Sequence, residues 1–487
     1  MKELLRWQAI SFISRGMAMV LGLVQSFVIL RILTQAQWGI VQLAVSIGGA
    51  LGIYQHLGLA SASTREIASS KDDTQVFKIF VTSMAIRYLV TLPLAVGLFF
   101  YSTKLATEVY NHPELVLPLK IYAVTLLFQS FQSILNSVIS GTKRFKQLFI
   151  YQAVIALVSV LLFVPLVYFY GVHGYFYAFL SFNVIGTLTL SVLAFRPLRG
   201  KLVFPSASDF RDLLKEIFSI SVVIYLVKII YTNWEKFGSN VLGLGNAAEV
   251  VAIYGFAMLF AKKLMNISDA VTAVNLPVLS EKFSKSVKDF KETFSGNFNR
   301  VFSVLLVSAA AASFWAPELV RLAAGEQKYL EYFDSLRLIP PLVVAFIFYS
   351  VVNILKSSVM VPAKLVKELL IGFVLLLAGT ASSFFMLTKF FNPLDSMAWG
   401  MALGSGLSFI FIRWAVKRNL RFSFFKRDHW LVLIQAVSII VAGTSDNLKV
   451  KVAAFLPLLL LLLLGLFISK FFTRRELLIV RKKLLRF

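Results

Sequence analysis

Long apolar runs constrain the fold of this sequence more than any other feature. Each run holds about 20 residues, enough to cross a hydrocarbon core of about 30 Å as a helix, and such runs recur along the whole chain. Of the 487 residues, 58% are hydrophobic and 15% are charged, whereas soluble domains are about 25% charged. We therefore predict an all-α integral membrane protein in which no soluble domain is left over.

Hydropathy and helix-breaking residues divide the chain into about fourteen predicted spans. The first is interpreted as an uncleaved helix, because Arg15 interrupts its apolar stretch and no small-residue cleavage site follows. The spans are predicted at residues 8–31, 37–60, 79–101, 115–140, 148–170, 174–195, 215–236, 250–272, 296–320, 336–360, 367–388, 395–415, 430–445 and 450–471.

Basic residues gather in alternate connections between the spans, which predicts the orientation of the chain. Lysine and arginine are retained on the cytoplasmic side during insertion, so we expect both termini to be cytoplasmic in a multi-pass protein of the cell (inner) membrane. Arg144, Arg199, Lys285 and Arg427 are then cytoplasmic. Positions predicted to face outward are Lys104, Lys328 and Asn447.

The formal net charge of +25 follows mostly from this orientation. The basic residues form no stripe with exposed aromatic residues, so no nucleic-acid partner is expected. Cysteine is absent, which excludes disulfides, thiolate metal sites and a cysteine nucleophile. No cofactor is expected.

Two long connections, 196–214 and 273–295, suggest how the spans are grouped. The first divides the chain after six spans, which predicts an N-lobe at residues 1–200 and a C-lobe at 201–425. Because both sets of six would start on the same side, they would be parallel repeats related by a pseudo-twofold axis along the membrane normal. Residues 426–487 would add two helices and a basic cytoplasmic tail.

Charged side chains deep in a span cost about 2.5–3.5 kcal/mol on insertion scales and usually face a bundle interior or a water-filled cavity. Helical spacing places such cations on polar stripes. The expected lining residues are Arg15, Arg87, Lys228 and Lys262, with Lys263 at the flank of the same cavity because its helix face is apolar. The alternative for Lys262 is a simple pair with an acid such as Glu235 or Asp269.

The balance of buried charge indicates the class of substrate. Glu235 and Asp269 are the deep acids, and the first six spans have none at their centres. A cavity with this excess of cations should attract a large anion, for which phosphate is the natural match. The two acids are candidates for coupling to H⁺ or Na⁺, or they neutralise lysines. Amide side chains such as Gln129, Gln132, Asn136 and Asn183 are interpreted as helix-packing groups.

Several segments, taken in order, resemble the Wzx-type polysaccharide flippases. They belong to the multidrug/oligosaccharidyl-lipid/polysaccharide exporter superfamily, which also holds the MATE multidrug exporters and the lipid II flippase. The matching segments are RILTQAQWGIVQLA (31–44), HLGLASASTREIA (56–68), SGTKRFKQLFIYQAV (140–154), YGVHGYFYAF (170–179), NWEKFGSNVLGLGNAAEVVAIYGFAMLF (233–260) and NLPVLSEKF (275–283).

The resemblance implies two six-helix lobes around a central cavity and alternating access. The implied activity is export of a polyprenyl-(pyro)phosphate-linked oligosaccharide from the cytoplasmic to the outer leaflet. Glu235 and Lys236 stand where such proteins often carry an acidic–basic pair. In the lipid II flippase two extra helices are associated with a lipid-tail groove, which suggests a role for the last two spans here.

Other function classes fit less well. A MATE-type multidrug exporter normally needs a carboxylate in its cation pocket, and a polysaccharide polymerase needs a sizeable outer loop with catalytic side chains. A lipid II-type flippase stays an alternative. We therefore expect a transporter, not an enzyme, whose partners are the lipid-linked oligosaccharide, membrane lipids and H⁺ or Na⁺. The chain is expected to be monomeric.

Overall fold

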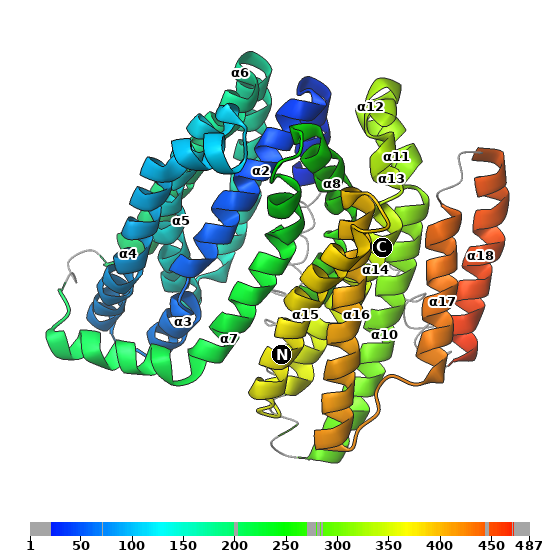
Figure 1. Cartoon of the computed structure of the whole chain (residues 1–487). Coiled ribbons are helices and arrows are strands. Elements are labelled where there is room, and N and C mark those ends of the chain that lie inside the picture. Colours follow the sequence, from blue (N-terminus) through cyan, green and yellow to red (C-terminus); the bar gives the residue numbers. More distant parts are fainter. Residues whose placement is uncertain are drawn as a thin grey trace. The chain divides into compact units, whose positions relative to one another are not determined.

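The computed structural model describes residues 21–70, 72–198, 203–269, 286–443 and 448–469, together with 279, 283 and 471. These residues are mostly helical and include no strand (Figure 1). Within them, ten helices are long and apolar enough to cross a membrane. The prediction of an all-α, multi-pass membrane protein is therefore confirmed.

The described helices lie at the positions of the predicted spans, but the number of spans is not fixed by them. The segment Leu21–Ile32, α7 (Ala207–Leu242) and α17 (Arg427–Ala442) fall outside the ten. In addition, α6 (Phe145–Phe195) is counted once although it contains two predicted spans. A total of fourteen stays a prediction.

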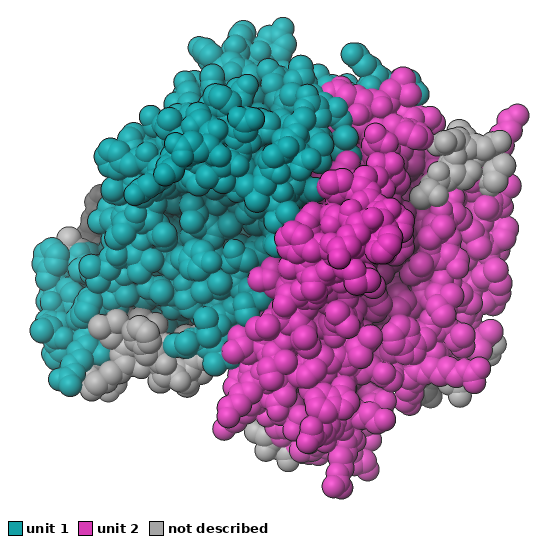
Figure 2. Space-filling model, viewed as in Figure 1, with its two compact units in different colours: residues 1–253, 323–328 teal, residues 254–322, 329–487 magenta. Residues whose placement is uncertain are grey.

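The chain forms two compact units, and Figure 2 colours them separately. Unit 1 contains residues 1–253 and 323–328, and unit 2 contains residues 254–322 and 329–487. Unit 1 thus includes all of α7, which the sequence placed in the second lobe. The units are defined by contacts within the structure, whereas the predicted lobes are defined by the order of spans along the sequence. The predicted lobe boundaries therefore stay a proposal.

Besides Leu21–Ile32, α6 and α7, the principal helices of unit 1 are α2 (Gln35–Gly52), α3 (Leu59–Ser69), α4 (Asp73–Lys104) and α5 (Val116–Gly141). The predicted span 37–60 is not one helix: a short 3₁₀ segment follows α2, and the chain bends before α3. The bend is at Leu57 and Gly58, whose φ angles of 46° and 72° end a right-handed helix. His56 lies at this bend.

A tight reversal divides α6. Gly171 has φ 55° and ψ −130°, outside helical values, and a Cβ on Gly174 would lie 1.8 Å from the Leu166 carbonyl oxygen. Aromatic rings on the two halves pack together, with 6.3 Å between the ring centroids of Phe163 and Phe182. The two predicted spans 148–170 and 174–195 are therefore an antiparallel helix pair.

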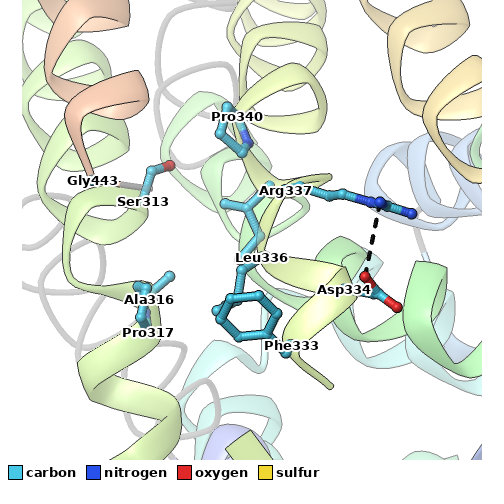
Figure 3. Close-up of a pocket in the computed structure, with 10 residues that line it drawn as sticks. Ser313, Ala316, Pro317, Phe333, Asp334, Leu336, Arg337, Pro340 and Gly443 are labelled. Atoms are coloured by element: carbon cyan, nitrogen blue, oxygen red, sulfur yellow. Dashed lines mark ion pairs between the residues drawn. The ribbon is translucent and has the colours of Figure 1, made fainter. Parts of the chain in front are cut away.

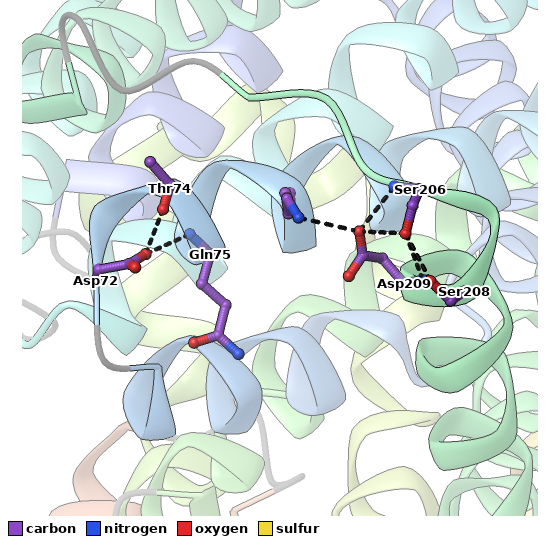
Figure 4. A network of polar contacts seen from close by, with 7 residues as sticks. Asp72, Thr74, Gln75, Ser206, Ser208 and Asp209 are labelled. Carbon is purple, nitrogen blue, oxygen red and sulfur yellow. Dashed lines mark hydrogen bonds and ion pairs between the residues drawn. The ribbon is translucent and has the colours of Figure 1, made fainter.

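Polar caps hold the ends of α4 and α7 (Figure 4). Asp72 accepts a hydrogen bond from the Gln75 backbone N–H at 2.8 Å. At the start of α7, the Asp209 carboxylate accepts from the Ser206 backbone N–H at 2.7 Å and pairs with Lys78 at 3.3 Å. The hydrogen bonds from Ser206, aided by Lys78, hold the pKa of Asp209 below its usual value.

Unit 2 takes in the second part of α8 (Ala248–Ala261) and the helices that follow. These are α10 (Val287–Phe314), α11 (Ala316–Ala324), α12 (Glu326–Glu331), α13 (Phe333–Leu336), α14 (Ile339–Leu355), α15 (Val366–Leu387), α16 (Pro393–Leu420), α17 and α18 (Leu448–Ile468). Parts of α11 and α12 belong to residues 323–328 of unit 1.

Two features hold unit 2 together. Gly404 brings α16 against α15 so closely that a Cβ would lie 2.5 Å from the Thr380 backbone nitrogen, the kind of contact that small residues permit between membrane helices. Along α10, phenylalanines repeat every fourth residue and stack with centroid distances of 5.6 to 6.2 Å. The stacked residues are Phe290, Phe294, Phe298 and Phe302.

Candidate functional site

Arg87 is the most deeply buried of the predicted site residues that the structure describes. It lies on α4 between Ser83 and Thr91, as its helical spacing predicted, and its side chain is completely buried. The guanidinium makes three hydrogen bonds to uncharged groups: Nε donates to Ser130 Oγ at 2.7 Å, Nη1 to Ser133 Oγ at 2.9 Å, and Nη2 to His56 Nδ1 at 3.0 Å. The positive charge is thus held by neutral acceptors.

The same network extends through the core of unit 1. Thr91 and Ser130 hydroxyl oxygens lie 2.8 Å apart, and Thr91 also donates to Gln55 Oε1 at 3.3 Å. A separate contact joins Ser83 to Ser63 at 2.7 Å. The Arg87 network thus joins α4 and α5 to the chain at Gln55 and His56.

Lys228 lies on α7, and its side chain is exposed. Its charge acts on both Arg87 and His56, so the structure brings together two of the predicted cations. Lys228 makes no hydrogen bond or ion pair with any residue that the structure describes. One turn away, Tyr225 donates to the Tyr54 carbonyl oxygen at 2.7 Å and ties α7 to the end of α2.

Glu235 and Lys236 form an ion pair on α7, with 3.3 Å between Oε1 and Nζ. Tyr231 also donates to the Glu235 carboxylate at 2.9 Å. Gly49 on α2 leaves room for the lysine, since a Cβ there would lie 3.1 Å from Lys236 Cε. This acid therefore has a cationic neighbour and a phenol donor.

Lys262 and Lys263 lie where the helix tightens after α8. The backbone N–H of Lys263, Met265 and Asn266 each donates three residues back instead of four. A 3₁₀ turn rotates each residue by about 20° more than an α-helix does. Lys262, Asn266 and Asp269, which share a face at ideal α-helical spacing, are all exposed despite this tightening.

These two lysines differ in exposure. Lys262 is exposed and Lys263 is half-buried, and their two positive charges repel each other. Asp269 is exposed, and its Oδ1 accepts from Asn353 Nδ2 at 2.8 Å. Lys262, Lys263 and Asp269 belong to unit 2, whereas Arg87, Lys228 and Glu235 belong to unit 1. Arg15 lies outside the described residues.

A polar pocket of about 780 Å³ opens beside the Arg87 network in unit 1. Its lining is almost entirely uncharged and polar, including His56, Gln129, Gln132, Ser133, Asn136 and Asn183. From the sequence, these four amide residues are expected to be helix-packing groups. The sequence did carry a signal, because Gln129, Ser133, Asn136 and Ser140 follow the i, i+4, i+7 and i+11 spacing of one helix face.

Two further pockets lie in unit 2. One of about 230 Å³ is lined by Ser313, Phe333 and Arg337 among others (Figure 3). Arg337 there is paired with Asp334 at 3.8 Å and with Asp395 at 3.4 Å, so its charge is compensated. The other, of about 570 Å³, is an apolar groove formed by α10 and α18.

Sequence comparison assigns most of the chain to one family. The family model described as "Polysaccharide biosynthesis protein" matches residues 4–311. No curated protein sequence matches the chain significantly.

Solved structures with the same fold include two kinds of membrane transporter. The lipid II flippase MurJ in an inward closed conformation matches with a TM-score of 0.70 and 13% identity, over 94% of this chain and 97% of that one. An inward-facing MATE-family multidrug resistance transporter of the MOP superfamily matches with a TM-score of 0.63 and 15% identity, over 84% and 99%. At such identities the likeness concerns the fold, and it confirms the predicted MATE-like architecture.

Proposed function

This chain belongs to the polysaccharide biosynthesis protein family, and from that premise we propose that it is a flippase for a lipid-linked oligosaccharide. Its substrate is an oligosaccharide on a polyprenyl (pyro)phosphate, which it moves from the cytoplasmic to the outer leaflet by alternating access. The two predicted lobes, 1–200 and 201–425, rock about the bound substrate. The protein acts in the cell membrane with both termini cytoplasmic.

The observation that carries the proposal is the excess of positive charge around Arg87 and Lys228. Arg87 has only neutral hydrogen-bond partners among the described residues, and Lys228 is exposed without an ion pair to any of them. A buried, uncompensated guanidinium raises the local potential, and a nearby exposed ammonium can contact an anion directly. This arrangement suits a phosphate or pyrophosphate group.

Unit 2 contributes its own cations to the proposal. Lys262 is exposed and Lys263 is half-buried beside it. We assign Lys262 to direct phosphate contact and Lys263 to the flank, with Arg15 as a further cation of the lining. Glu235 and Asp269 are the proposed sites of H⁺ or Na⁺ coupling. The apolar groove of α10 and α18 suits the lipid chain of the substrate.

A multidrug exporter is the second candidate because it shares the fold. Such a protein would need a carboxylate available to an organic cation. In unit 1 the best-placed acid, Glu235, already pairs with Lys236 and accepts from Tyr231. The charge balance therefore favours an anionic substrate over a cationic drug. A lipid II-type flippase would use the same charges and differs in the glycan it carries.

Transport by purified protein tests the proposal. Proteoliposomes would be loaded with the glycolipids extracted from the cells that encode the chain, and a membrane-impermeant glycosidase would report the sugars that reach the opposite leaflet. We expect translocation by the wild type and a loss of roughly tenfold for Lys228→Gln, about 1.4 kcal/mol of binding. Lys389→Gln, at an exposed lysine of unit 2, is the matched control. Ethidium efflux without glycolipid transport would favour the multidrug alternative.

The orientation is tested separately by single cysteines, since the native chain contains none. Cysteines at positions 144, 199, 285 and 427 should be labelled by an impermeant thiol reagent only from the cytoplasmic side. Cysteines at 104, 328 and 447 should be labelled from outside. Labelling of position 285 from outside would overturn the assignment.

A further inference from the structure

The polar pocket of unit 1 has a lining suited to a neutral, hydroxyl-rich ligand. Its volume of about 780 Å³ lies within the range of about 300–1,000 Å³ usual for small-molecule sites. Among the residues that the structure describes, the lining contains no acid, lysine or arginine. Asn and Gln side chains each offer two donors and an acceptor, which is the pattern that sugar hydroxyl groups require.

Several of these polar groups are fixed in place by the fold. Gln132 Nε2 donates to the Asn183 carbonyl oxygen at 2.6 Å and to Thr187 Oγ1 at 3.1 Å. Asn183 is 3% exposed, and its own amide donates to the Phe179 carbonyl oxygen at 2.7 Å. Gly186 leaves space for this arrangement, because a Cβ there would lie 3.1 Å from Gln132 Nε2.

Arg87 orients two more lining groups, Ser133 and His56, through hydrogen bonds. An arginine can only donate, so Ser133 Oγ and His56 Nδ1 both accept from it. His56 Nδ1 therefore carries no proton, and in the neutral imidazole the proton is on Nε2. Ser133 keeps its own O–H to donate. Arg87 is in this respect a positioning residue for the pocket.

Other polar groups of the lining have unused hydrogen-bonding capacity. The Asn136 amide and the Ser140 hydroxyl form no hydrogen bond with any other residue that the structure describes, and the same holds for Gln132 Oε1. A drug-like apolar molecule would leave these groups unpaired, which costs about 1–3 kcal/mol for each buried group. A phosphate would find no cation among the lining side chains.

We propose that this pocket binds sugar residues of the lipid-linked substrate, whereas the cation Lys228 of the same unit binds its phosphates. The proposal rests on the proposed function and adds where the glycan is recognised. Gln129 and Asn136 are the specificity-determining residues, because both lie on α5 with their amides in the lining.

Protection of single cysteines tests this assignment. Gln129→Cys and Asn136→Cys would each be introduced into the cysteine-free chain and alkylated with a polar maleimide. The probes are the glycolipid extract of the cells that encode the chain, the lipid fraction of the same extract after mild acid has released its oligosaccharides and these have been washed away, and inorganic pyrophosphate. We expect only the intact extract to slow alkylation, by about fivefold, because such pockets cover 70–90% of a ligand.

Asn419→Cys is the matched control, because Asn419 is exposed on α16 and should react equally fast with every probe. Equal rates at both pocket cysteines with intact and acid-treated extract, in a protein that transports the glycolipid, would overturn the sugar site alone. Failure of the wild type to transport the glycolipid would instead overturn the proposed function. Protection by pyrophosphate alone would make the pocket a phosphate site and would also contradict the proposal.

Discussion

Arg87 of unit 1 and Lys262 of unit 2 are accommodated in opposite ways. In unit 1 the Arg87 side chain is completely buried, and three neutral acceptors satisfy its planar guanidinium. In unit 2 the ammonium of Lys262 is exposed, at a point where the helix backbone tightens. Arginine offers five donors in a fixed fork, whereas lysine is a compact and strongly hydrated charge. Arg87 is therefore part of the core of unit 1, whereas Lys262 is exposed.

The largest effect is expected from Arg87→Met, which keeps an unbranched stem but removes every donor. We expect a loss of about 3 kcal/mol in the free energy of unfolding, since hydrogen bonds from charged groups contribute about 1.5–3 kcal/mol each and relief of the buried charge offsets part of that. Transport should fall more than roughly a hundredfold. Thermal unfolding in detergent, with Arg418→Met as the exposed control, measures the first quantity. An unchanged Tm would show that Arg87, like Lys262, does not contribute to the stability of the core.

Lys262→Gln should lower transport by roughly tenfold to a hundredfold, because phosphate contacts from charged donors contribute about 1.5–3 kcal/mol each. Its unfolding should match that of the wild type. Lys262→Arg should retain more activity because the charge remains, and Lys263→Gln should have a smaller effect because Lys263 is half-buried. The same proteoliposome assay measures all three. Equal losses for Lys262→Gln and Lys263→Gln would contradict the assignment of their roles.

Lys228→Gln compares an exposed cation with a buried one inside unit 1, since Lys228 is exposed close to the buried Arg87. The loss of roughly tenfold in transport should come without a loss of stability, because relief of repulsion between the two cations favours the folded state. Unfolding and transport are measured on the same preparation. A large drop in Tm would show that Lys228, like Arg87, belongs to the core.

The smallest effect concerns Asp209, a charged group of unit 1 outside the proposed phosphate site. Its pKa is lowered in the folded state by hydrogen bonds from Ser206 and by Lys78. Its stabilising contribution should therefore be fully present above the usual aspartate pKa of about 3.9 and be lost as the pH falls through the lower folded pKa. Unfolding between about pH 6 and pH 3 should be less pH-dependent in Asp209→Asn. Identical profiles for both proteins would exclude this contribution.

Local sequence spacing predicted the helix faces of unit 1 well. The alignment of Ser83, Arg87 and Thr91 needed only the period of an α-helix, and the structure buries all three of these side chains on α4. The occlusion of Arg87 could not be predicted in this way. Its partners Ser130 and Ser133 lie more than forty residues away, so their contact depends on how α4 and α5 pack.

In unit 2 the helix that carries the predicted cations is irregular. The alignment of Lys262 with Asp269 assumes a constant rotation per residue, whereas three hydrogen bonds after α8 span three residues instead of four; Lys262, Asn266 and Asp269 are nevertheless all exposed. Nothing in the sequence of this segment identifies the irregularity, because it contains neither proline nor glycine between residues 258 and 270. The bend at His56, by contrast, is accompanied by Gly58.

The reversal at Gly171 and Gly174 limits how unit 1 can move. With so short a connection, and with Gly174 packed against the backbone at Leu166, the two halves of α6 have no slack to slide along each other. Adding even one methyl group at Gly174 would force them apart. Deformation during a transport cycle must therefore be concentrated in other connections. The two halves of α6 should move together as one rigid body.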